Sequence, residues 1–140
     1  MTTYSKAKAN LLWARVLLAK EEGFGPGQGF RYDIADFVQE AWPEKGVPAL
    51  IPVSVEARKH QEAGIKTRYE HSVPLGVLFK MMLETDTVEE MVDVIERHYQ
   101  TAFVTIEEDK RINALGYRSK MPADWDGNIM ARYDAAGIQF

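Results

Sequence analysis

The sequence contains no cysteine in its 140 residues. Disulfide-stapled folds, thiol nucleophiles and cysteine-bound zinc are therefore excluded. The absence does not fix the cellular compartment, because a chain without thiols has nothing to oxidise. The fold must rest on packing, hydrogen bonds and ion pairs.

Long hydrophobic runs are also lacking. No run approaches the roughly 18 consecutive apolar residues of a membrane span. The first ten residues, MTTYSKAKAN, lack the apolar core of a signal peptide. These features predict a soluble, intracellular protein with a cytoplasmic location and no membrane partner.

A strong excess of one charge is missing too. The 17 basic and 21 acidic side chains leave a net charge of −4, too small to mark the chain as a nucleic-acid binder or an acidic mimic of DNA. Apolar residues, by contrast, are plentiful at 46% of the chain. In a chain of this length they predict one compact core and a single domain over residues 1–140.

Helical periodicity dominates the first part of the chain. Gly23 is a stop signal for the first helix, Asp33 a candidate N-cap for a short helix that ends before Pro43, and Ser54 a candidate cap for the next. We expect helices at residues 5–22, 34–42 and 55–63, with a loop at 23–29 and irregular chain at 43–52.

The second part of the chain predicts two short extended segments among further helices. Thr87 and Glu90 form a capping-box sequence, and Thr105 and Glu108 form another. We expect a strand at residues 65–69, helices at 75–82 and 88–99, an extended segment at 102–104, and helices at 106–115 and 128–136. The fold class is therefore mainly α, built around an antiparallel helix hairpin with at most one or two short strands.

The glycine-rich segment at residues 23–29 invites a phosphate-binding interpretation. A P-loop needs Gly-Lys-Ser/Thr at its end, and a dinucleotide site needs a preceding strand. This segment follows a helix and ends in Gly29-Phe30. We therefore expect a plain connection between helices that binds no nucleotide.

A more informative polar group lies at Glu70 and His71. The short turn between the two central helices folds them into an antiparallel pair, so the start of the first lies beside the end of the second. Glu70 and His71 are therefore expected near His98. The next helix begins close to the same end and carries two further acids, Glu107 and Glu108. A shared polar pocket is the prediction.

Two interpretations of this pocket remain open. Neutral imidazole can act as a general base near pH 7, and a neighbouring carboxylate can hold a divalent metal. Alternatively, Glu70 and His71 satisfy free N–H groups at a helix start, and His98 is favoured by the helix dipole in a last turn.

A resemblance bears on the first interpretation. Glu70-His71-Ser72-Val73-Pro74-Leu75 resembles the Asp/Glu-His-x-x-Pro opening of the His-Me finger (HNH) nucleases, over about six residues. The resemblance implies that His71 is the base, with Glu70 and His98 as metal ligands. The same segment, together with the stretches at residues 120–122 and 131–138, is similar to small uncharacterised proteins of phages and plasmids.

The loop at residues 117–127 mixes cations, aromatic residues, proline and glycine, a composition suited to contacting a partner. Arg118 and Lys120 are its candidate contacts, and Trp125 either joins them or anchors the loop to the core. A second basic cluster precedes His71 and comprises Arg58, Lys59, Lys66 and Arg68. The far end of the hairpin is acidic, with Glu84, Asp86, Glu89, Glu90 and Asp93.

Two functional hypotheses follow. The first is a non-enzymatic regulator or inhibitor that acts through protein–protein or protein–nucleic-acid contact at Lys66, Arg68, Arg118, Lys120 and Trp125, with no cofactor. The alternative is a metal-dependent phosphodiesterase or nuclease that uses Glu70, His71 and His98 with Mg²⁺ or Mn²⁺. The partner and the oligomeric state stay open.

Overall fold

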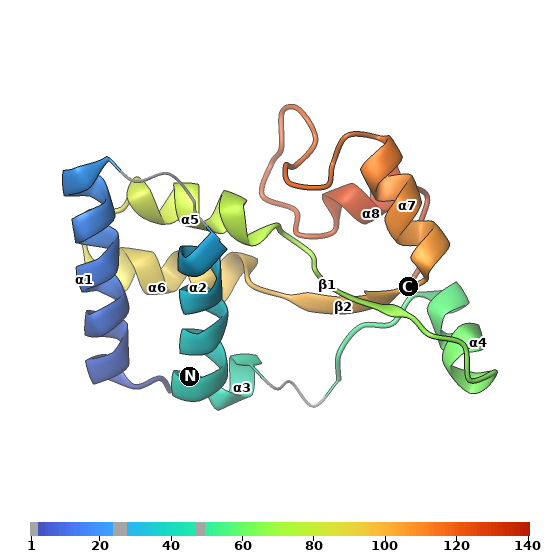
Figure 1. Ribbon diagram of the computed structural model, residues 1–140, viewed down its shortest axis with the longest axis horizontal. Coiled ribbons are helices and arrows are strands. Elements are labelled where there is room, and N and C mark those ends of the chain that lie inside the picture. The colour runs from blue at the N-terminus through green and yellow to red at the C-terminus, as the bar shows by residue number, and fades with distance from the viewer. Residues whose placement is uncertain (1–2, 24–27, 47–49) are drawn as a thin grey trace. The chain divides into compact units, whose positions relative to one another are not determined.

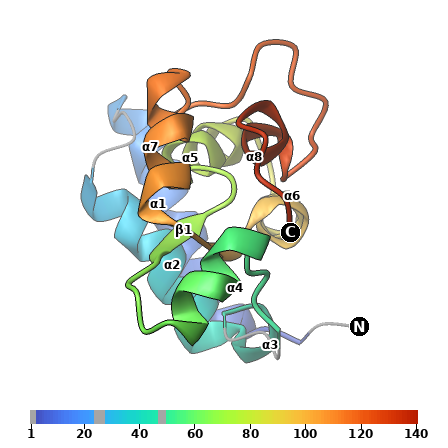
Figure 2. The same ribbon diagram turned by 90° about the vertical axis from the view of Figure 1, so that its right-hand side faces the viewer.

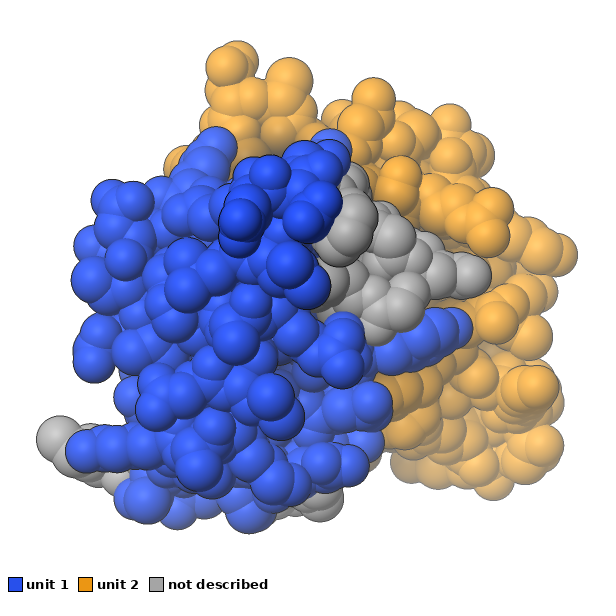
Figure 3. All heavy atoms as spheres, turned by 60° about the vertical axis from the view of Figure 1, so that its left-hand side comes forward, with its two compact units in different colours: residues 1–49, 75–99 blue, residues 50–74, 100–140 orange. Residues whose placement is uncertain are grey.

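The computed structural model describes residues 3–23, 28–46 and 50–140. The chain divides into two compact units (Figure 3). Unit 1 comprises residues 1–49 and 75–99, and unit 2 comprises residues 50–74 and 100–140. Neither unit is continuous in sequence, and the single-domain expectation stays a prediction.

Unit 1 is built from helices alone in its described part (Figure 1). Ser5 caps the first helix by accepting a hydrogen bond from the Lys8 backbone at 3.3 Å, and Gly23 ends it in a left-handed conformation with φ of 75°. The helices are α1 (Lys6–Glu22), α2 (Gln28–Ala41), α3 (Pro43–Gly46), α5 (Leu75–Leu83) and α6 (Val88–His98).

The core of unit 1 lies where α1 and α2 pack against the hairpin of α5 and α6. Leu78 of α5 and Ile95 of α6 are fully buried, as the apolar stripes of the sequence predict. Thr87 caps α6 by accepting from the Glu90 backbone at 3.1 Å. The other large side chains of this core that are fully buried are Val16, Ile34, Val38, Trp42, Phe79, Met82 and Met91.

Unit 2 combines short helices with one small sheet. Its elements are α4 (Val55–Glu62), β1 (Arg68–His71), β2 (Thr101–Val104), α7 (Ile106–Ala114) and α8 (Ala131–Ala135) (Figures 1 and 2). The two strands pair antiparallel, with Glu70 opposite Ala102 and His71 opposite Thr101. The segment before α4 lies along the other edge of β2, where Val53 forms a bridge to Phe103.

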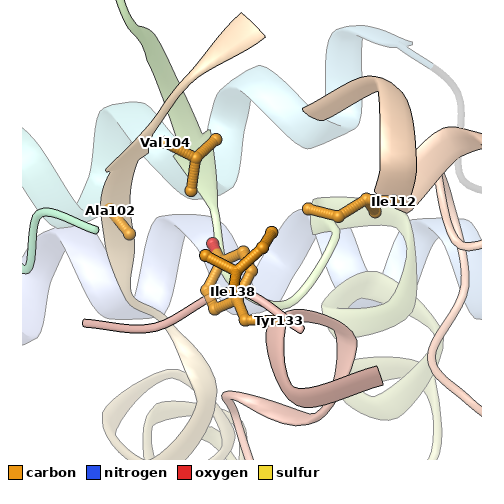
Figure 4. Close-up of a cluster of buried hydrophobic side chains, with 5 residues drawn as sticks. All are labelled: Ala102, Val104, Ile112, Tyr133 and Ile138. Carbon is orange, nitrogen blue, oxygen red and sulfur yellow. The ribbon is translucent and has the colours of Figure 1, made fainter. Parts of the chain in front are cut away.

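One face of this sheet is covered by the apolar core of unit 2. Figure 4 shows Tyr133 and Ile138 lying between the strand residues Ala102 and Val104 and the α7 residue Ile112. All five are buried. Because side chains alternate along a strand, the residues of β1 that share the face of Ala102 and Val104 are their cross-strand partners, Glu70 and Arg68.

The mainly α class is confirmed: the described part of the chain holds eight helices and a two-stranded sheet. The helix expected at 34–42 begins earlier, at Gln28, so Asp33 is not its cap and instead pairs with Arg15 at 3.1 Å. The chain at 43–52 is not wholly irregular, because α3 follows Trp42. The glycine-rich loop falls largely on residues 24–27, outside the described residues.

The expected strand at 65–69 is displaced along the chain. β1 runs from Arg68 to His71, so Glu70 and His71 belong to the strand and not to a corner before α5. Pairing with β2 explains the shift, because β2 offers a paired residue to each position of β1 as far as His71, which lies opposite Thr101. The last helix is also shorter than expected, because residues 128–130 form turns before α8.

Candidate functional site

The polar centre of unit 2 is the guanidinium of Arg132, which is 2% exposed. α8 carries Arg132 toward the end of β1. There the guanidinium donates hydrogen bonds to the backbone carbonyls of His71, at 2.6 Å, and of Ser72, at 3.0 and 3.1 Å. A further bond of 2.8 Å reaches the carbonyl of Tyr117, just after α7. One buried cation therefore ties together three segments that are distant in sequence.

Glu70 is the charged partner of this cation. Its Oε1 lies 3.2 Å from Nη2 of Arg132. Burial raises the pKa of Glu70, the positive charge of Arg132 opposes that rise, and the neighbouring carboxyl of Asp109 adds to it. A guanidinium therefore already engages the carboxylate that the sequence offered as a metal ligand.

His71 follows Glu70 in the same strand and faces the other side of the sheet. Its ring lies 6.3 Å from that of Tyr69, which packs on Phe103 at 5.2 Å between ring centroids. Burial lowers the pKa of His71, and the charge of Arg132 lowers it further. The imidazole is thus kept neutral at pH 7 on one face, while the Glu70 carboxylate lies on the opposite face.

His98 is the last residue of α6 in unit 1, whereas Glu70 and His71 lie in unit 2. Burial lowers the pKa of His98, with Arg97 contributing in the same direction. A pocket common to all three residues would span both units and stays a prediction.

Glu108 has a role that the capping box predicts in part. Its Oε1 accepts from the Thr105 backbone at 2.8 Å, and the Thr105 hydroxyl accepts from the Glu108 backbone at 3.0 Å. The same carboxylate oxygen also accepts from the Ser54 hydroxyl at 2.6 Å, so it joins the starts of α4 and α7. Glu107 lines a hollow between these helices with His60.

The loop between α7 and α8 is held by its own hydrogen bonds. Trp125 donates from Nε1 to the Asn128 carbonyl at 2.7 Å, and Asp126 accepts from the Asn128 backbone at 3.0 Å. Asn128 in turn donates to Asp134 of α8 at 3.2 Å. Trp125 is half-buried, whereas Arg118 and Lys120 are exposed, and both roles considered for Trp125 stay predictions.

Of the predicted basic cluster, Arg68 pairs with Asp109 at 3.5 Å and remains 54% exposed, and Lys66 is exposed beside it. Both lie in unit 2 with the loop cations. The predicted acidic end of the hairpin forms a shallow hollow in unit 1, lined by Glu84, Glu89, Glu90 and Asp93 together with Met81, Thr85 and Val94.

Sequence reasoning missed the three residues that complete the polar centre: Asp109, Arg132 and Tyr133. The Tyr133 hydroxyl lies 3.2 Å from that of Ser72. Burial raises the pKa of Tyr133, and the charge of Glu70 raises it further. The sequence contained one signal for Arg132, which lies beside apolar positions of the last predicted helix. A buried arginine needs several hydrogen-bond acceptors around it.

Within residues 3–23, 28–46 and 50–140, no group of three or more His, Asp or Glu side chains is arranged to hold a metal ion. The same residues contain no helix that is both long and apolar enough to cross a membrane. Comparison with protein-family models, with curated proteins and with solved structures finds no match to this chain.

Proposed function

We propose that this protein is a small non-enzymatic module, of the regulator or inhibitor type, that binds an acidic surface on a protein partner. The contact is made by the loop between α7 and α8 through Arg118 and Lys120, with Lys66 and Arg68 beside β1 as further cations of the same unit.

The observation that carries the proposal is the pairing of Glu70 with buried Arg132. If the Glu70 carboxylate moved to bind a metal, the buried guanidinium would lose its counter-ion. An unpaired charge in a low-dielectric interior is costly. His71 lies on the opposite face of the strand from Glu70. A base and its metal ligand need to face the same reacting group, so this alternation favours a structural role for the pair.

The same guanidinium also supports the binding role. It holds the carbonyl of Tyr117, the residue before Arg118, at 2.8 Å. Trp125 and Asn128 fix the other end of the loop. A loop whose backbone is held near both ends loses less backbone entropy on binding, which favours recognition of a partner surface.

Charge favours a protein partner over a nucleic acid. Unit 2 carries nine Lys and Arg side chains against nine Asp and Glu, so the entire net charge of −4 belongs to unit 1. A binder of a polyanion normally presents a net positive surface, because affinity comes from neutralising several phosphates. Four cations on a neutral unit are better matched to a small acidic patch.

A cleavage assay separates this proposal from the nuclease alternative. We expect no Mg²⁺- or Mn²⁺-dependent cleavage of DNA or RNA by the wild-type chain, and a lowered melting temperature in His71→Ala. His60→Ala, which alters the histidine of the α4–α7 hollow, serves as the control. Cleavage that His71→Ala abolishes while melting is unchanged, and that His60→Ala leaves intact, contradicts the proposal.

The binding surface is tested by crosslinking in cells of the source organism, followed by mass spectrometry. We expect one protein to crosslink to the wild-type chain and to be lost in Arg118→Glu/Lys120→Glu. The matched control is Arg58→Glu/Lys59→Glu, which reverses two exposed cations on α4 of the same unit. Retention of that protein by the loop variant, or crosslinks mainly to nucleic acid, argues against the proposed contact.

A further inference from the structure

The first helix carries apolar residues on two faces, and only one face is buried. Ala9, Leu12, Val16 and Ala19 form the buried face, against α2, α5 and α6. A second apolar row, which we call the outer stripe, consists of Ala7, Leu11, Ala14 and Leu18. Its leucines are strongly exposed, Leu11 at 65% and Leu18 at 50%. α1 lies at the edge of unit 1 (Figure 1).

The spacing of the outer stripe is that of a helix-pairing surface. Its members follow one another at intervals of four, three and four residues, so they lie along one side of the helix for about three turns. Leucine alternates with alanine along it. Such a row fits another helix, because the small residues let the two backbones approach while the leucines fill the space beside them.

The charges that flank the stripe indicate which helix fits. Lys6 and Lys8 lie near the start of α1, where Lys8 also pairs with Glu40 at 3.1 Å, and Glu21 and Glu22 lie at its end. This order opposes the helix dipole, which favours acidic residues at the start and basic residues at the end. A parallel partner with the same sequence would place like charges together. An antiparallel copy brings Lys6 of each helix beside Glu21 of the other.

We propose that two copies of this chain associate through the outer stripe of α1, with the helices antiparallel and crossing at Ala14. Each Leu11 then packs beside Leu18 of the second copy, and the contact is the same from both sides, as a two-fold dimer requires. These residues lie outside the loop of the proposed function, so either idea can fail without the other.

The extent of the stripe sets the strength expected. A helix of 17 residues is about 25 Å long, and one such pair is a small interface with two leucines per copy. We expect a weak, concentration-dependent dimer with a dissociation constant on the order of tens to hundreds of micromolar.

Sedimentation equilibrium of the full chain tests the proposal, with Leu11→Glu as the disrupting variant. We expect the wild type to dimerise and Leu11→Glu to weaken the dimer by about tenfold or more, because a carboxylate replaces a leucine in the contact. Leu115→Glu, which makes the same change at a leucine that is 49% exposed on unit 2, is the control and should leave the dimer unchanged. Circular dichroism verifies that both variants remain folded.

A charge swap then tests the direction of pairing. Lys6→Glu alone and Glu21→Lys alone should each weaken the dimer, whereas the chain that carries both changes should regain most of the wild-type affinity. A chain that stays monomeric at all concentrations up to about 1 mM overturns the proposal. So does a dimer that Leu11→Glu leaves intact, or a double swap that fails to restore association.

Discussion

Arg132 keeps a full positive charge in a position that is 2% exposed, and its environment explains how. A guanidinium has five N–H donors and no acceptor, so burying it requires several oxygens in one place. The end of β1 supplies two carbonyls, the start of the loop after α7 supplies a third, and Glu70 supplies the opposite charge. The residue therefore serves as a structural centre of unit 2.

Replacement of Arg132 should destabilise the folded protein. We expect Arg132→Met to lower the free energy of unfolding by about 3–5 kcal/mol, because Glu70 is left without its buried counter-ion and three carbonyls lose a donor. Urea titration followed by circular dichroism measures the change. Arg118→Met, which removes an exposed arginine, should stay within about 0.5 kcal/mol of the wild type. A cost below about 1 kcal/mol for Arg132→Met contradicts the structural role.

The buried imidazole of His71 predicts a dependence of stability on pH. Its pKa is lowered in the folded protein, by burial first and then by Arg132, from an ordinary value of 6.5. The unfolded chain therefore takes up a proton before the folded one does, and stability should fall as the pH drops below about 6.5. His71→Gln should show a smaller fall over this interval in urea titrations at successive pH values. An equal fall in both chains contradicts the prediction.

Sequence alone found some of these residues and missed others for a physical reason. The capping pairs were visible because they act over three residues: Thr105 with Glu108, and Ser54 with the backbone of Ala57. Arg132 meets residues 60 positions away at Ser72, and only the fold brings them together. The contact of Glu108 with Ser54 is likewise between residues 54 positions apart.

At the scale of elements, periodicity predicted the helices of the hairpin well and the strands poorly. The stripes on α5 and α6 repeat over several turns, and they are buried as expected. β1 has four residues, and its bounds depend on pairing with β2 rather than on its own pattern. The start of α2 was misplaced because Asp33 is a good cap by residue type, while the helix continues through it.

The hairpin prediction can be measured at Leu78 and Ile95, both fully buried. We expect Leu78→Ala or Ile95→Ala to lower the free energy of unfolding by about 2–5 kcal/mol, through lost burial and the cavity that remains. Leu115→Ala, at a half-exposed leucine, should cost much less. Chemical denaturation gives all three values, and full stability in either buried variant is incompatible with the packing of α5 on α6.

At the scale of the molecule, the order of segments along the chain couples the two units. Residues 75–99, which fold as the hairpin in unit 1, are inserted between the two strands of unit 2. The ends of an antiparallel hairpin lie close together, so the folded hairpin closes the loop that separates β1 from β2. When the hairpin is unfolded, β1 and β2 are joined by a long flexible connection. Bringing the strands together then costs about 1–2 kcal/mol more than when the hairpin is folded.

This coupling predicts one cooperative unfolding transition for the whole chain. Ile95→Ala, a change confined to unit 1, should lower the melting temperature in a single calorimetric peak and also reduce hydrogen-exchange protection in β1 and β2 of unit 2. Ile112→Ala in the core of unit 2 is the matched change and should reduce protection in α5 and α6. The reason is that each unit is built from two chain segments, and a segment of the other unit connects them. When one unit unfolds, the two segments of the other are joined by a longer flexible connection, so that unit loses stability as well. Two separate calorimetric transitions, or strand amides whose protection is unchanged in Ile95→Ala, would show that the units unfold independently.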